Sequence, residues 1–284
     1  MTAIRLSKLH ATGNDFLVWS WLDATGASRA VNSTLAARLC DRHTGIGADG
    51  LIVVEQSRSD ADVEMSLFNA DGGPAEMSGN GIRTLAWVAA RDGAVRGDRL
   101  CVDTRAGLRE IALTRDPATG EVTDATVDMG PVTWDPARIP VALDSPFGIT
   151  AEFHGTPYEG DAAGMGNPHL VLFVDDPATA RVTQHGPHLE HDERFPQRTN
   201  VEFVRVTPGA IDEIDMRVWE RGVGETSSCG TGACATAAVA HRRGLVGERV
   251  TVHVPGGDLT VELGDTIRLG GPVVHVFDVE VDLS

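Results

Sequence analysis

The stretch "MSLFNADGGPAEMSGNG", residues 65–81, decides the fold because the chain repeats it later without a gap. Its partner is "MRVWERGVGETSSCGTG", residues 216–232, and both copies run through a glycine turn into a helix of small and apolar residues. An internal repeat of this kind is typical of two similar structural units. The sequence therefore predicts an α+β protein with two pseudo-symmetric lobes. Each lobe is expected to be a mainly antiparallel sheet wrapped around a central helix, with the active site in the cleft between the lobes.

The segment between the two copies is rich in proline. Residues 129–148 contain four prolines, which suit a crossover between lobes better than a central strand. We expect an N-terminal lobe over residues 1–130 and a C-terminal lobe over residues 131–271. The last strand, at about residues 272–284, alternates apolar and polar residues and could pair with the N-terminal lobe.

Composition argues against several classes of partner. The chain has 284 residues and a formal net charge of −17 with no basic patch, so neither nucleic acid nor an anionic membrane is an expected partner. No apolar run approaches the roughly 18 residues of a membrane helix. The first residues lack the pattern of a signal peptide. We therefore expect a cytoplasmic protein that acts on a small molecule.

Three further motifs favour structural roles. "GIGADG", residues 45–50, follows a helix-like stretch and precedes a strand-like one, the reverse of the dinucleotide-binding order, and indicates a turn. The helix before it is expected over residues 33–42, with Asn32 or Ser33 as its N-cap. "HGPHLEHDE", residues 185–193, offers three histidines, but its Gly-Pro pair disfavours a helix. A solvated loop, rather than a metal site, is therefore expected there.

The four cysteines are expected to be reduced, because they form no CxxC pair and suit no disulfide framework. Cys40, Cys101 and Cys234 lie in apolar patterns and are interpreted as packing residues. Cys229 differs, because it stands at the start of a helix, where free backbone N–H groups and the helix dipole favour an anion. That position predicts a thiol pKa lowered from about 8.5 toward 7 and a helix start that can bind a carboxylate.

The repeat aligns Ser78 with Cys229. If a pseudo-twofold axis relates the lobes, the two helix starts face each other across the cleft and flank one small ligand. Inversion by proton transfer requires protic groups on opposite faces of one carbon, one to remove the α-proton and one to return a proton. The helix starts would hold the carboxylate of an amino acid and stabilise developing enolate-like charge.

At these residues the chain resembles the diaminopimelate epimerase family. The motifs that carry the resemblance span the chain in order: "ATGNDFLV", "CDRHTGIGADG", "FNADGGPAEMSGNGIR", "GMGNPHLV", "TNVEFV", "WERGVGETSSCGTGACA" and "VHVPGG". The resemblance implies interconversion of LL- and meso-diaminopimelate, in the synthesis of lysine and peptidoglycan precursors. It also implies that no cofactor and no metal take part, and that the protein is a homodimer.

The resemblance assigns roles to individual residues. Cys229 and Ser78 take the two catalytic positions, and His169 matches an active-site histidine. Ten residues match positions that bind the substrate: Asn14, Asn69, Gly79, Asn80, Asn167, Asn200, Glu220, Arg221, Gly230 and Thr231. The four that belong to the helix starts would hold the reacting α-carboxylate.

Ser78 departs from the family pattern, which places the second catalytic cysteine there. A serine hydroxyl is a much weaker acid than a thiol and supplies no comparable resting anion. An epimerase that works with a Ser/Cys pair, with impaired or one-base activity, is one interpretation, and a deliberate Cys-to-Ser change that traps substrate is another. A dehydratase of a hydroxylated amino acid, a non-catalytic diaminopimelate-binding relative and an epimerase of another amino acid also stay open.

Overall fold

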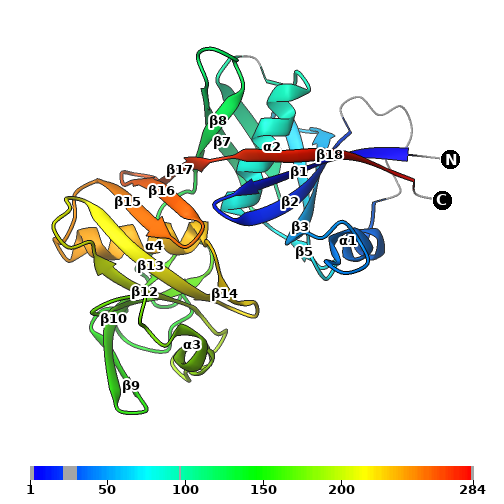
Figure 1. Cartoon of the computed structure of the whole chain (residues 1–284). Coiled ribbons are helices and arrows are strands. Elements are labelled where there is room, and N and C mark those ends of the chain that lie inside the picture. Colours follow the sequence, from blue (N-terminus) through cyan, green and yellow to red (C-terminus); the bar gives the residue numbers. More distant parts are fainter. Residues whose placement is uncertain (1–2, 22–30, 96, 283–284) are drawn as a thin grey trace. The chain divides into compact units, whose positions relative to one another are not determined.

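The computed structural model describes residues 3–21, 31–95 and 97–282 (Figure 1). The chain separates into two compact units, one of Met1–Asp128 with Gly270–Ser284 and the other of Met129–Leu269. The boundary between Asp128 and Met129 thus falls at the start of the proline-rich segment, near the expected boundary at residue 130. Strands with a few helices make up each unit, and the α+β class is confirmed.

The first unit wraps a sheet around one buried helix, α2. Its strands run β1–β2–β3–β4–β6–β7–β8, with parallel pairing of β2 with β3 and of β4 with β6 and antiparallel pairing elsewhere. Helix α2 contacts β1, β2, β3, β4 and β8, so the sheet curves around it. The elements are β1 (Ala3–Ala11), β2 (Asn14–Ser20), α1 (Ser33–Cys40), β3 (Gly50–Gln56), β4 (Val63–Asn69), β5 (Pro74–Ala75), α2 (Gly79–Arg91), β6 (Arg99–Thr104), β7 (Gly107–Arg115) and β8 (Val122–Asp128).

The C-terminal strand returns to this first unit. Strand β18 (Val274–Asp282) follows β17 (Arg268–Pro272) and pairs antiparallel with β1, from Ala3 opposite Asp282 to His10 opposite Val274 (Figure 1). An ion-pair cluster supports the pairing, since Asp278 on β18 accepts hydrogen bonds from Arg5 and Ser7 on β1.

The second unit repeats this plan. Strand β11 pairs parallel with β12, as β2 does with β3, and β13 pairs parallel with β15, as β4 does with β6. Helix α4 is its central helix and contacts β10, β11, β12, β13, β15 and β16. The elements are β9 (Ile149–Phe153), β10 (Thr156–Gly164), β11 (Pro168–Phe173), α3 (Val182–Glu190), β12 (Asn200–Val206), β13 (Glu213–Glu220), β14 (Gly224–Thr226), α4 (Gly230–Arg242), β15 (Arg249–Val254) and β16 (Gly257–Glu262).

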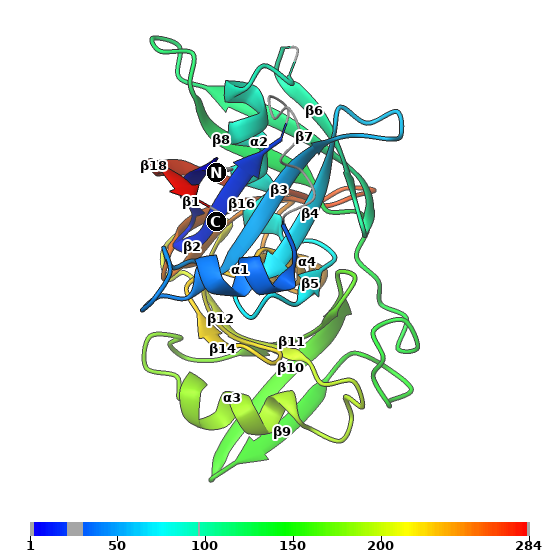
Figure 2. The same ribbon diagram turned by 90° about the vertical axis from the view of Figure 1, so that its right-hand side faces the viewer.

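Each unit has its own apolar core and an outer helix. Helix α1 packs on β3 and β4, and α3 packs on β12 and β13 (Figure 2). Alternation puts Val63, Met65 and Leu67 of β4 inside, each at most 4% exposed. Burying such a side chain contributes about 1.5–3 kcal/mol relative to leaving it in water, so the alternating pattern selects which face of the sheet meets the helix.

The expected helix over residues 33–42 is shorter than predicted. Helix α1 ends at Cys40, and its N-cap is Asn32, whose side chain accepts a hydrogen bond from the Leu35 N–H at 3.0 Å. Asp41 ends the helix because its carboxylate accepts hydrogen bonds from the N–H groups of His43 and Thr44. "GIGADG" then forms a turn, and Gly50 opens β3.

The expectation of a solvated loop at residues 185–193 is wrong. Residues up to Glu190 belong to α3, and His185 is buried with its Nδ1 2.6 Å from the Tyr158 hydroxyl. Pro187 costs one backbone hydrogen bond, but Val182, His185 and Leu189 pack inward and outweigh it. Gly186 serves close packing, since a Cβ there would lie 2.5 Å from the Trp219 ring.

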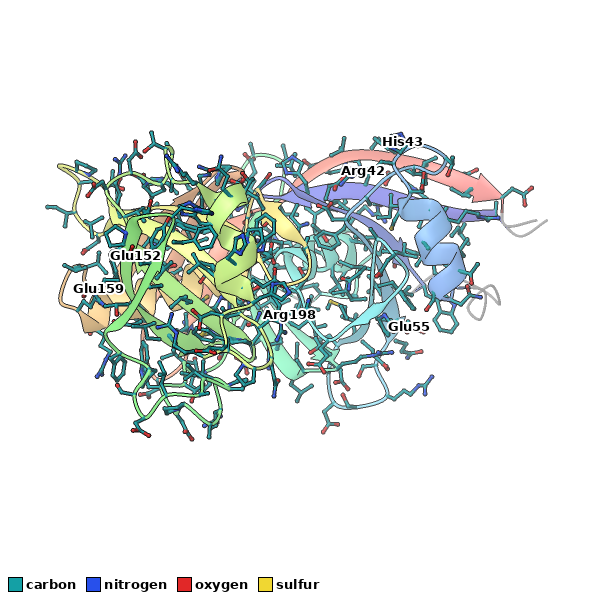
Figure 3. The ribbon with its side chains drawn as sticks, turned by 90° about the horizontal axis from the view of Figure 1, so that it is seen from below. Arg42, His43, Glu55, Glu152, Glu159 and Arg198 are labelled. Carbon is teal, nitrogen blue, oxygen red and sulfur yellow. The ribbon has the colours of Figure 1, made fainter. Side chains whose placement is uncertain are left out.

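Two other features concern exposure. Cys101 is half-buried rather than buried, because it lies on the opposite face of β6 from Leu100 and Val102. Among the described residues, no helix is both long and apolar enough to cross a membrane. The hairpin of β9 and β10 carries the labelled acidic residues Glu152 and Glu159 (Figure 3).

Candidate active site

Cys229 stands where the sequence places it, at the start of the central helix of the second unit. It is the N-cap of α4 with an extended backbone, it is 5% exposed, and its side chain makes no capping hydrogen bond. Its Sγ lies 3.5 Å from the Thr231 hydroxyl. Glycines at positions 230 and 232 flank Thr231 in the first turn of the helix, and backbone N–H groups at a helix start favour a small anion.

A line of polar contacts leads from Cys229 to the interior of this unit. Asn167 Nδ2 lies 3.5 Å from the Thr231 hydroxyl, and Asn167 Oδ1 lies 2.9 Å from His169 Nε2. His169 Nδ1 in turn lies 2.7 Å from Glu202 Oε1, and both of these side chains are fully buried. The structure therefore brings together Cys229, Thr231, Asn167 and His169, and adds Glu202 to them.

The expected lowering of the Cys229 pKa is wrong for this structure. Burial of the thiol, followed by the nearby carboxylates of Glu220 and Glu202, raises its pKa well above the ordinary value. The Thr231 hydroxyl and the Gly232 backbone N–H lower the pKa, but they do not compensate for burial and the two carboxylates. The helix start alone predicted an anion, but two acidic side chains from neighbouring strands reverse that outcome. Cys229 is therefore a thiol, a proton donor, before a ligand binds.

Glu220 is the last residue of β13 and interacts with this thiol. It is half-buried, and it accepts a hydrogen bond from the Thr226 hydroxyl on β14. Burial raises the pKa of its carboxyl, while hydrogen bonds to Thr226 and Cys229 lower it less. Glu220 is thus a second acidic group close to Cys229.

Asn200 and Arg221 are tied to the backbone of the second unit. Asn200 is 3% exposed, its Nδ2 donates to the Pro168 carbonyl, and its Oδ1 accepts from the Arg221 N–H. The guanidinium of Arg221 donates to the Gln197 carbonyl at 3.2 Å. The Asn200 amide therefore orders the turn that carries Arg221. Arg198, labelled in Figure 3, lies in the loop before β12, 3.7 Å from Glu190.

In the first unit, Ser78 is the N-cap of α2. Its backbone is extended like that of Cys229, but its Oγ accepts a hydrogen bond from the Gly81 N–H at 3.0 Å. A serine is a strong N-cap, so one lone pair of this oxygen is already used. The O–H stays available as a donor, which makes Ser78 better suited to give a proton than to take one.

Asn80 and Asn14 meet beside Ser78. Asn80 Nδ2 lies 3.3 Å from Asn14 Oδ1, and Asn80 Oδ1 accepts from the fully buried Arg83 at 2.9 Å. Asn14 Nδ2 donates to Asp49 at 2.6 Å, and Asp49 pairs with Arg42. These contacts fix both amides at the start of α2.

Asn69 is also a predicted site residue of the first unit. Among the described residues, no side-chain hydrogen bond joins it to Asn14, Ser78 or Asn80. It ends β4, as Glu220 ends β13, and it is exposed. Its backbone closes the turn that follows, because its N–H donates to the Gly73 carbonyl and its carbonyl accepts from Gly72. Its side chain is therefore open to a ligand.

The residues beneath the two helix starts differ. A Cβ on Gly81 would lie 3.0 Å from the end of Ile52 and 3.3 Å from the Phe16 ring, whereas one on Gly232 would lie 2.7 Å from Glu202 Oε1. Ile52 and Glu202 hold the same place, third in the parallel ladders of β2 with β3 and of β11 with β12. Glu202 was missed from the sequence, although a charged residue in the otherwise apolar "NVEFV" is an available signal.

Comparisons with known proteins agree with this architecture. A family model described as "Diaminopimelate epimerase" matches residues 6–134 and 162–275. The chain is 40% identical to the "Diaminopimelate epimerase" of Pseudomonas entomophila, over 99% of both chains. It is 42% identical to that of Moorella thermoacetica, over 95% of this chain and 96% of the relative.

Solved structures show the same fold at low identity. A hydroxyproline epimerase from Agrobacterium vitis has a TM-score of 0.69 and 16% identity, and the match covers 99% of this chain and 93% of that one. A phenazine biosynthesis protein of the PhzF family from Bacillus anthracis has a TM-score of 0.70 and 15% identity, with all of both chains covered. The fold, the repeated helix starts and the extent of the sequence matches lead to one conclusion: the chain belongs to the diaminopimelate epimerase family.

Proposed function

We propose that this protein is an isomerase that interconverts LL- and meso-diaminopimelate, by proton removal and return at one α-carbon and without a cofactor. The observation that carries the proposal is Cys229, a buried N-cap thiol at a glycine-rich helix start, in a chain that matches diaminopimelate epimerases over nearly its whole length. By family membership, the reaction belongs to the synthesis of lysine and peptidoglycan precursors.

In the proposed reaction, the ligand α-carboxylate binds the N–H groups at the helix starts, including those of Gly79, Asn80, Gly230 and Thr231. These donors also stabilise negative charge as it develops on the carboxylate when the α-proton leaves. The amides of Asn14, Asn69, Asn167 and Asn200, with Glu220 and Arg221, are proposed to recognise the amino-acid ends. His169 supports the Cys229 half of the site through Asn167.

The two catalytic positions differ in what they can do. Cys229 starts as a thiol, and an ammonium group placed beside Glu220 and Glu202 would offset the carboxylates that hold its pKa high. The thiolate so formed is the base for the α-proton. Ser78 can donate its O–H to the opposite face, but its weak acidity makes that step slow. We propose an epimerase with reduced turnover, or a one-base enzyme that exchanges the α-proton faster than it inverts the carbon.

Incubation with LL-diaminopimelate in D₂O tests the proposal. Chiral chromatography with mass spectrometry should find meso product that carries one deuterium, and Cys229→Ala should abolish its formation. A one-base enzyme would put deuterium into LL-diaminopimelate without meso product.

Absence of both exchange and inversion, with ligand binding retained, would contradict catalysis and favour the non-catalytic binder. A dehydratase would leave diaminopimelate unchanged and release a keto acid from a hydroxylated amino acid. The cytoplasmic location stays a prediction.

The homodimer implied by the resemblance is also proposed. Strand β18 exposes Val274, Val276 and Phe277, each at least 42% accessible, and such apolar side chains are suited to burial against a second copy. Light scattering over a range of protein concentrations should give the mass of a dimer, and a monomer at all concentrations would contradict it.

A further inference from the structure

Glu202 is a fully buried carboxylate in the interior of the second unit. It lies on β12, an otherwise apolar strand at this point, with Val201 and Phe203 on either side and also fully buried. Its Oε1 is 2.7 Å from His169 Nδ1. Its Oε2 is buried and has no hydrogen-bond partner in the described part of the chain. Removing a carboxylate from water costs free energy unless the carboxylate is paired. The presence of Glu202 in this apolar interior therefore suggests a function.

The contacts of His169 define how this pair is protonated. Nε2 lies 2.9 Å from Asn167 Oδ1, an acceptor, so Nε2 carries a proton. Asn167 Nδ2 then faces the Thr231 hydroxyl, and that hydroxyl lies 3.5 Å from Cys229 Sγ. Nδ1 faces the Glu202 carboxylate, so a second proton lies between these two atoms. The line of donors thus runs from His169 through Asn167 and Thr231 toward the sulfur, and the Glu202 carboxylate accepts the proton on the other side of the His169 ring.

Glu202 is also close to the thiol in space. Its Oε1 and Cys229 Sγ lie 2.7 Å and 3.3 Å from the point where Gly232 would carry a Cβ. His169 is linked to the sulfur by contacts through Asn167 and Thr231. The missing side chain at Gly232 is what admits both groups under the helix start. The equivalent place in the first unit holds Ile52, which has no charge.

We propose that Glu202 is a positioning residue of the Cys229 half-site: its carboxylate orients His169 and holds the neighbouring thiol in the protonated form before substrate binds. The proposal rests on the proposed function, in which Cys229 exchanges a proton with the α-carbon. Nearby negative charge raises a thiol pKa, and Glu202 acts on Cys229 in that direction. The enzyme would then make its thiolate only when a cationic ligand enters the half-site.

Alkylation of Cys229 at a series of pH values tests this role without turnover. Iodoacetamide labelling is followed at the Cys229 peptide by mass spectrometry, so the other three cysteines do not interfere. Glu202→Gln keeps the shape and removes the charge, and it should lower the pH midpoint of labelling. Below the midpoint, each unit of pKa lost should raise the rate roughly threefold, because thiolate fraction rises tenfold while nucleophilicity falls.

Two further variants separate charge from structure. Glu202→Asp keeps the charge with a shorter reach, so its labelling midpoint should stay near that of the unchanged protein. Its kcat should fall several-fold at constant KM, because His169 is less well held. Asp161→Asn is the matched control, since Asp161 is a buried acid of the same unit that contacts Arg243 and Gly148 instead. It should leave the labelling midpoint unchanged.

An unchanged midpoint in Glu202→Gln would overturn the proposal, even if that variant is less stable. If Glu202→Gln does not fold, ¹⁵N NMR of His169 in the unchanged protein decides. Protons on both ring nitrogens would support the proposal, whereas an unprotonated Nδ1 would show that Glu202 holds the proton and has no charge, and would overturn it. A shifted midpoint without diaminopimelate turnover would instead contradict the proposed function and leave the role of Glu202 in place.

Discussion

The two units build the same kind of helix start, but the residues packed beneath it differ. Ser78 and Cys229 are both N-caps with extended backbones, followed by helices of the same length, Gly79–Arg91 and Gly230–Arg242. Ile52 and Phe16 lie under the first start, whereas Glu202, bonded to His169, lies under the second. The repeated backbone therefore provides two similar helix starts, and the side chains below them differ in charge.

The caps show the same division. The Ser78 oxygen caps α2 through the Gly81 N–H, whereas the Cys229 sulfur makes no capping hydrogen bond to α4. A buried cation, Arg83, donates to Asn80 at the start of α2, whereas two carboxylates lie near Cys229. These differences lead us to expect faster proton exchange at Cys229 than at Ser78. The following predictions test this difference, from the largest expected effect to the smallest.

Loss of the sulfur should have the largest effect. Cys229→Ala should lower kcat for epimerisation by roughly 10³-fold or more, because positioned acid–base groups contribute about 10²–10⁴-fold. Steady-state kinetics with LL-diaminopimelate measures it. Cys234→Ala, in the same helix and fully buried, is the control and should retain activity. Comparable loss in both variants would show that damage to α4, rather than loss of an acid–base group, explains the result.

Restoring a thiol in the first unit should raise activity. Ser78→Cys should increase kcat about 10- to 100-fold, since a thiol exchanges protons far better than a hydroxyl. Ser78→Ala is the companion variant. It should lose inversion and about 1 kcal/mol of unfolding free energy, because the cap of α2 is gone. A Ser78→Cys enzyme no faster than the unchanged protein would mean that position 78 does not exchange the proton.

Alanine at the third helix position should affect the units unequally. Gly232→Ala forces a Cβ to 2.7 Å from Glu202 Oε1, which His169 holds in place, and should cost about 1–3 kcal/mol. Gly81→Ala meets the movable end of Ile52 at 3.0 Å and gains about 1 kcal/mol of helix propensity, so its stability should change little. Urea unfolding of both variants measures the difference in unfolding free energy. Equal losses in the two variants would contradict the contrast between the residues beneath Gly81 and those beneath Gly232.

The smallest effect concerns Asp15. It follows Gly-Asn in "GNDFLV", residues 13–18, where the corresponding "GNPHLV" of the second unit, residues 166–171, has Pro168. Burial raises the pKa of Asp15, but hydrogen bonds from Arg42 and Lys8 outweigh it and lower the pKa to about 2. Its stabilisation is therefore present above the unfolded value of about 3.9 and is lost as the pH falls toward 2. Asp15→Asn should cost on the order of 1 kcal/mol at pH 7, since Arg42 is exposed.

Urea unfolding at pH 7 and at pH 2.5 measures this loss, and the gap between the variant and the unchanged protein should narrow at the lower pH. Asp60→Asn, at an exposed position, is the control and should show no gap at either pH. A gap that stays constant would mean that the Asp15 charge is not what stabilises the fold.

Much of the fold was predictable, because the repeat, the glycine turns and the alternating strands are local or periodic signals. The helix over residues 185–190 was not, because its Gly-Pro pair is unfavourable on its own and only packing against Trp219 and Tyr158 compensates. At the candidate site, Cys229 and Ser78 could be placed at helix starts from the sequence. Glu202 could not be linked to them, because its contact with His169 joins two neighbouring strands.

The sequence by itself determined the two-unit plan, the family and the exchange of sulfur for oxygen at position 78, since these depend on residue identity and spacing. Only the tertiary structure decided the protonation of Cys229. A helix start favours a thiolate within one segment, but burial and carboxylates from β12 and β13 raise the thiol pKa. Electrostatic free energy depends on distances and solvent access across the fold, and neither is encoded in any one stretch of the chain.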